Sequence, residues 1–122
     1  MEKSHVVEEY DLQAKCSKDA KAWFNENWAR DKDTFLLDFT NHYNKTMNKC
    51  FILVYYNYSI GKDGAWANDM TVWDVYENSK YGSFGNIHYP SSREEVALCE
   101  IGSAKCKTLQ EFNGLAGQYM NN

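Results

Sequence analysis

Apolar residues recur at helical spacing near both ends of the chain. From residue 6 to about residue 31 they fall on one wide stripe, while most of the charged residues fall on the other side. A second stripe runs from residue 109 towards the C-terminus, and Thr108 with Glu111 forms a capping box in front of it. We therefore expect a long N-terminal helix and a shorter C-terminal helix.

Between the two helices the pattern changes to a period of two residues, which is typical of strands. Residues 35–43 alternate, residues 50–60 are apolar on both faces like a central strand, and shorter runs follow at 70–76 and 81–89. The connections are short, so neighbouring strands should be antiparallel. The predicted fold class is α+β: a long N-terminal helix packed on a four- to five-stranded antiparallel sheet, with a C-terminal helix, in a single domain spanning residues 1–122.

The four cysteines are predicted to form two disulfides. Gly102 and the serine after it suit a type II′ turn, and this register sets Cys99 opposite Cys106 at a distance that a disulfide requires. Cys16, on the inner stripe of the first helix, is then left to pair with Cys50 at the start of the central strand.

Composition argues against two classes of partner. The formal net charge is -4 and the isoelectric point is near 5.3, so no broad basic surface is available for nucleic acid or anionic lipid. The most apolar stretch, residues 50–56, is about a third of the roughly 20 residues that a membrane-spanning helix needs. We expect no nucleic-acid partner and no membrane span.

The cysteines also bear on the compartment of the protein. An even number of cysteines without close pairs favours disulfides over a zinc site, and disulfides persist in oxidising compartments. No signal peptide follows Met1, so we expect Met1 to be an artificial start on the mature part of a periplasmic or secreted protein. If Met1 is the native start, the expected location is the cytoplasm.

Two runs and a cysteine pair resemble a known group of proteins. The runs are HYNKTMNKCFILV at residues 42–54 and VWDVYENSKYGSF at residues 72–84, and the pair is Cys99 with Cys106. Together they resemble small, uncharacterised bacterial proteins that are usually predicted to be exported. The resemblance covers most of the chain from about Cys16 onward and implies removal of a leader, from which the present N-terminus departs. It implies no function.

Candidate catalytic residues are few. A thiolate at Cys50 could pair with His42 or His88, but we expect Cys50 to be in a disulfide. Asp38 and His42 project from the same strand face about 13 Å apart, too far for a direct pair. His5 and the other histidines show no metal-ligand spacing with the cysteines, so we expect neither a metal nor another cofactor.

The aromatic residues suggest binding more than catalysis. Trp66 is expected in a loop within residues 61–69, where it either packs back or contacts a partner. Tyr56, Tyr58 and Tyr81 lie in predicted strands, where an open sheet face could present them to a ligand or partner. The alternative is that the helices cover these aromatics as core.

Three functions follow from these patterns. The favoured one is a noncatalytic extracytoplasmic binding or interaction module, of which a small exported inhibitor is one version, with Trp66 and the tyrosines as the contact residues. The alternatives are a small enzyme with a shallow cleft near His42 and Asp38, and an intracellular structural subunit with reduced cysteines. A carboxylate within hydrogen-bond distance of His42 would favour the enzyme, and an exposed aromatic patch would favour binding.

Overall fold

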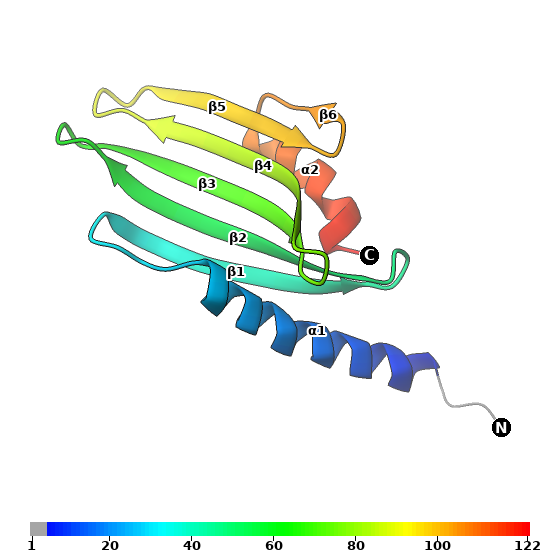
Figure 1. Ribbon diagram of the computed structural model, residues 1–122. Helices are drawn as coiled ribbons and strands as arrows, with labels where there is room; N and C mark the ends of the chain where they lie inside the picture. Colours follow the sequence, from blue (N-terminus) through cyan, green and yellow to red (C-terminus); the bar gives the residue numbers. More distant parts are fainter. Residues whose placement is uncertain (1–4) are drawn as a thin grey trace.

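The protein folds as one antiparallel sheet with a helix on each face (Figure 1). The structure is a computed structural model that describes residues 5–122. The elements in chain order are α1 (His5–Asn27), β1 (Thr34–Asn44), β2 (Lys49–Ile60), β3 (Ala65–Asp74), β4 (Ser79–His88), β5 (Glu94–Ile101), β6 (Ala104–Lys105) and α2 (Leu109–Met120). The strands lie side by side in sequence order, each antiparallel to the next. The predicted α+β fold is confirmed, with six strands in place of four or five.

Two differences from the expected elements have clear causes. The connection between β2 and β3 is only the turn 61–64, in which Gly61 and Gly64 have positive φ, so β3 begins at Ala65, before Trp66. The expectation that Trp66 lies in a loop was therefore wrong. The first part of β5, Glu94 to Leu98, is exposed on both faces. Because neither face is buried, its residues do not alternate between apolar and polar, and the sequence does not identify it as a strand.

The α1 face of the sheet is held by packing and by a disulfide. Cys16 and Trp23 of α1 pack against Ile52 and other apolar residues of β2, and the Trp23 Nε1–H donates to Asn78 Oδ1 at 2.8 Å. Cys16 is bonded to Cys50 with a Cα–Cα distance of 5.4 Å. This confirms the first predicted disulfide, which ties the helix to the central part of the sheet.

The opposite face is covered by α2. Tyr119 packs on Phe51 of β2, and Phe112 packs on Phe84 of β4. The predicted cap is present because the Glu111 N–H donates to Thr108 Oγ1 at 3.0 Å. The second predicted disulfide, Cys99 to Cys106, is also confirmed, with a Cα–Cα distance of 5.0 Å. It lies just before the helix and fixes the β5–β6 hairpin to the chain that enters α2.

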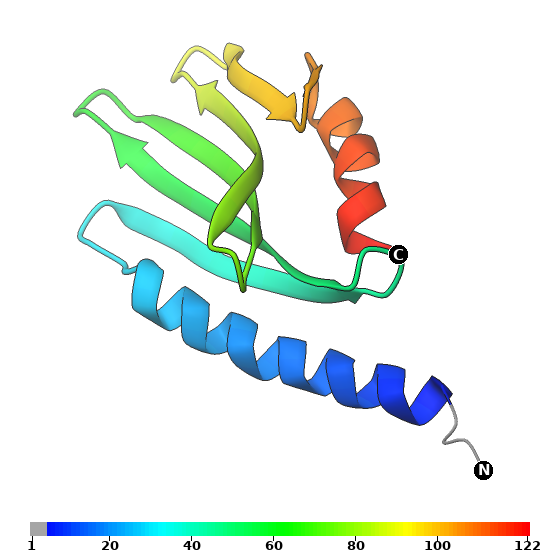
Figure 2. The same cartoon turned by 45° about the vertical axis from the view of Figure 1, so that its right-hand side comes forward.

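The sheet bends around α2, and the helix covers only part of the concave face. The helix contacts β1 and β5, which lie near opposite sides of the sheet, and Figure 2 shows the strands curving towards it. Its C-terminal end is held near the β1–β2 turn, where the Asn44 amide donates to the carbonyls of Gln118 and Tyr119. The end of the concave face near the β2–β3 turn is left open to form a hollow. Neither helix in the described part of the chain is long and apolar enough to cross a membrane.

Candidate ligand-binding site

Three asparagines lie in a row across the open end of the concave face. Asn57 of β2 is the cross-strand partner of Asn68 in β3, and Asn68 is the partner of Asn86 in β4. Strands in a sheet lie about 4.8 Å apart, so the row spans roughly 9.6 Å. These residues line a hollow of about 440 Å³, within the usual size range of small-ligand sites. We call it the asparagine hollow.

One wall of the asparagine hollow is a pair of stacked rings. Trp66 and His88 are cross-strand neighbours, and their rings stack with centroids 3.8 Å apart and planes 7° apart. The edge-on ring of Phe35 lies 5.5 Å from Trp66, centroid to centroid. His88 Nδ1 lies 3.0 Å from Glu94 Oε1 at the start of β5. The rings are therefore held in place, and the start of α2 at Leu109 lines another side of the hollow.

Two side-chain oxygens of the asparagine row accept no hydrogen bond from residues 5–122. The Oδ1 atoms of Asn57 and Asn86 are buried, and neither has a hydrogen-bond partner among residues 5–122. The Asn86 side chain is only 8% exposed, and an unpaired buried polar group costs about 1 to 3 kcal/mol. Rotation about χ2 of asparagine is soft, so either end of the amide can turn towards a bound molecule. A buried polar group without a partner calls for an explanation, and a molecule bound in the adjoining hollow could supply the missing hydrogen bond.

A buried asparagine elsewhere shows the opposite behaviour. Asn44 is completely buried and donates to two carbonyls of α2, and its Oδ1 accepts from the Met47 N–H at 2.9 Å. Its amide is thus fully used to join the β1–β2 turn to the end of α2. The contrast separates a structural asparagine from those of the hollow.

The four residues predicted for binding do not form one site. Trp66 lines the asparagine hollow and is half-buried in β3. Tyr56 and Tyr58 lie on the opposite face, where their rings stack at 4.6 Å and Trp28 of the α1 side meets Tyr56 edge-on. Tyr81 packs against Phe51 and Tyr119 beside the α2 core. Their role in binding stays a prediction, but it would involve two separate surfaces.

The surface around Tyr58 carries a perturbed carboxyl group. The Tyr58 hydroxyl donates to Asp69 Oδ2 at 3.1 Å, and burial raises the pKa of the Asp69 carboxyl above its ordinary value although this hydrogen bond opposes the rise. Asp69 lines a hollow of about 260 Å³ with Trp28 and Lys80. The aromatic rings here are largely engaged with one another, so we regard this surface as secondary.

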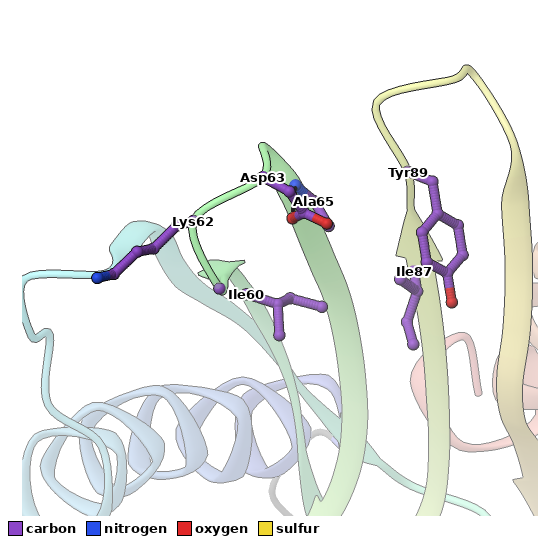
Figure 3. Close-up of a pocket in the computed structure, with 7 residues that line it drawn as sticks. Ile60, Lys62, Asp63, Ala65, Ile87 and Tyr89 are labelled. Carbon is purple, nitrogen blue, oxygen red and sulfur yellow. Dashed lines mark hydrogen bonds between the residues drawn. The ribbon is translucent and has the colours of Figure 1, made fainter.

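A larger hollow at the β2–β3 turn offers less chemistry. Figure 3 shows Ile60, Ile87 and Tyr89 around it, with Lys62 extending away. Its volume is about 610 Å³, but Asp63, the carboxylate beside it, already accepts from the Ala65 N–H at 3.1 Å. The site therefore lacks the spare buried polar groups of the asparagine hollow.

The histidine proposed for the enzyme alternative, His42, has no carboxylate partner among residues 5–122. Nε2 of His42 is buried without a hydrogen-bond partner in the described chain, while Asp38 accepts from the N–H of the next residue, Phe39, at 2.8 Å. No three histidine, cysteine or carboxylate side chains of the described chain gather closely enough to hold a metal ion. The activity and the expected lack of a metal both stay predictions.

Sequence reasoning missed the asparagine row and the pair of His88 with Glu94. A signal was present for two of the three asparagines. Asparagine is depleted in strands, yet Asn57 and Asn86 lie within predicted strands, whereas Asn68 lies in the segment expected to be a loop. Their meeting depends on cross-strand register, which the sequence does not display. Comparison with protein-family models, with curated proteins and with solved structures finds no match to this chain.

Proposed function

We propose that this protein is a noncatalytic binding module that works outside the cytoplasm and holds a small ligand in the asparagine hollow. The observation that supports it best is the buried, unpartnered Oδ1 of Asn86, a residue that lines that hollow. A ligand that donates a hydrogen bond would relieve the cost of this group. The two disulfides are typical of proteins from an oxidising compartment and support the extracytoplasmic part of the proposal.

The residues around the hollow favour binding over catalysis. The floor is made of amides, which neither gain nor lose protons near neutral pH. The one imidazole in the wall, that of His88, is stacked on Trp66 and directed to Glu94. General acid–base chemistry needs a group that is positioned to exchange a proton with the substrate. The His88 ring is held by Trp66 and Glu94 instead.

The proposal is tested by the stability of the free protein. Replacement Asn86→Leu removes an unsatisfied buried amide and puts an apolar side chain of the same branched shape in its place, so we expect the free energy of unfolding to rise by about 1 kcal/mol. Replacement Asn44→Leu removes an amide that makes three hydrogen bonds and should lower it by about 2 to 4 kcal/mol. Urea unfolding followed by circular dichroism measures both.

The control decides how the result is interpreted. A gain in stability at Asn86 beside a loss at Asn44 is the behaviour of a residue kept for binding at some expense of stability. If Asn86→Leu destabilises the protein as much as Asn44→Leu, Asn86 is a structural residue and the proposed site is wrong.

A further inference from the structure

We infer that the ligand class of the asparagine hollow is a neutral saccharide, about a disaccharide in length, lying across the strands along the asparagine row. This rests on the proposed function and adds the chemistry of the ligand. It combines three properties of the hollow: the uncharged floor, the spacing of its amides and the apolar surface beside them.

The floor selects an uncharged molecule. Asn57, Asn68 and Asn86 carry no charge. Two charged residues also line the hollow: Glu94, which is paired to His88, and Lys107, which is exposed in front of α2. A ligand with a full charge on the floor would lose its water without gaining an opposite charge, which is costly. Each asparagine amide instead offers both a donor and an acceptor, and a hydroxyl group can satisfy either.

The spacing favours a saccharide over a peptide. Neighbouring strands place successive amides about 4.8 Å apart, whereas an extended peptide presents groups to the same side only every two residues, about 6.8 Å. A peptide laid along the row would therefore meet one amide and miss the next. A pyranose carries hydroxyl groups around the whole ring, so it can meet amides at the shorter spacing.

Apolar side chains flank the amides. Trp66 and Phe84 line the hollow together with Val96 and Leu109, which are 40% and 38% exposed and so leave apolar surface open to a ligand. A sugar ring has C–H faces as well as hydroxyl edges, so it can pack against these side chains while the edges reach the floor. The hollow thus matches an amphipathic, uncharged ligand.

The test is a titration of the whole protein, labelled with ¹⁵N, with cellobiose, maltose and N,N′-diacetylchitobiose at millimolar concentrations. An end-blocked alanine tripeptide is the comparison probe. We expect at least one disaccharide to shift the side-chain NH₂ resonances of Asn57, Asn68 and Asn86, and the tripeptide to leave them unchanged. The variant Asn86→Leu should weaken binding about tenfold or more, because it removes hydrogen bonds and narrows the floor. Asn113→Leu, at an exposed position of α2, is the matched control and should bind as the unaltered protein does.

The outcomes separate the ligand class from the site. If no disaccharide binds, or if the tripeptide binds in the hollow instead, the saccharide inference is wrong. The proposed binding function then still stands if Asn86→Leu stabilises the free protein. If a disaccharide binds equally well to Asn86→Leu, it binds elsewhere and the inference is also wrong. Disaccharide binding that is lost in Asn86→Leu and kept in Asn113→Leu supports it.

Discussion

At the scale of single residues, buried polar groups fall into two kinds. Asp74 is 1% exposed, yet its carboxylate accepts from Lys49 Nζ at 3.0 Å and from the N–H groups of Tyr76 and Glu77 at 3.1 Å. The same hydrogen bond raises the pKa of the Lys49 ammonium above its ordinary value. Asn86, also buried, lacks a partner for its oxygen in the described chain. The burial of Asp74 is explained by its hydrogen bonds within the fold, whereas the burial of the Asn86 oxygen is not.

Two glycines give a prediction about packing at this scale. A Cβ on Gly82 would lie 2.6 Å from Ile101 Cγ1, so Gly82→Ala overpacks the α2 core and should lower the free energy of unfolding by about 1 to 3 kcal/mol. Gly114 in α2 has no atom within 4 Å of the added Cβ, so Gly114→Ala should raise it by about 0.5 to 1 kcal/mol through helix propensity. Thermal and urea unfolding measure both, and equal effects in the same direction would contradict the packing described around Gly82.

At the scale of elements, the two exposed strand edges, on β1 and on the first part of β5, are protected in different ways. On β1, the Tyr43 N–H donates a hydrogen bond to the Gln13 side chain of α1, and the Phe39 N–H donates one to the side chain of Asp38. On β5, the exposed first half begins with Glu94 and Glu95, and charged residues at an open strand discourage pairing with other chains. Such protection discourages the pairing of either edge with a strand of another chain.

The disulfides give the prediction that belongs to this scale. In the chain-entropy model, the bridge from Cys16 to Cys50 contributes about 3.8 kcal/mol and that from Cys99 to Cys106 about 2.5 kcal/mol, because the first closes a longer loop. Replacing both cysteines of the first bridge by alanine should therefore destabilise the protein more than the same change in the second. Unfolding in urea measures the difference, and a larger loss from the second pair would show that strain or denatured-state structure dominates. Free thiols in protein from an oxidising compartment would oppose the extracytoplasmic proposal.

At the scale of the whole molecule, charge sets which partners are favourable. The net charge of -4 gives no excess of cations that could release counterions from nucleic acid. The proposed ligand site is instead the hollow beside α2, where the row of three asparagines carries no charge.

The corresponding prediction concerns partners that should not bind. We expect no tight binding of duplex DNA at physiological salt in a fluorescence anisotropy titration, and no stoichiometric metal in elemental analysis of the purified protein. Tight duplex binding or one equivalent of zinc would contradict the expectation from charge and cysteine spacing.

The sequence by itself determined the features that depend on local periodicity. The apolar stripes identified both helices, alternation identified the first strand, and a run that is apolar on both faces identified the central strand. The register of the turn at Gly102 was enough to pair Cys99 with Cys106 and so Cys16 with Cys50. These follow from neighbours along the chain. Their physical basis is the repeat of a helix or strand, which a single sequence displays.

Only the tertiary structure decided which residues meet across the sheet. The register shift between Gly85 and Asn86 resets the pairing of β4 with β5 at the hollow, and another shift between Val72 and Trp73 does so for β3 with β4. A shift of one residue moves a side chain to the other face, so the sequence could not show that Trp66 and Tyr56 lie on opposite faces. Asn57, Asn68 and Asn86 meet for the same reason: turn length and register set their alignment, and neither is written in the pattern of apolar and polar residues.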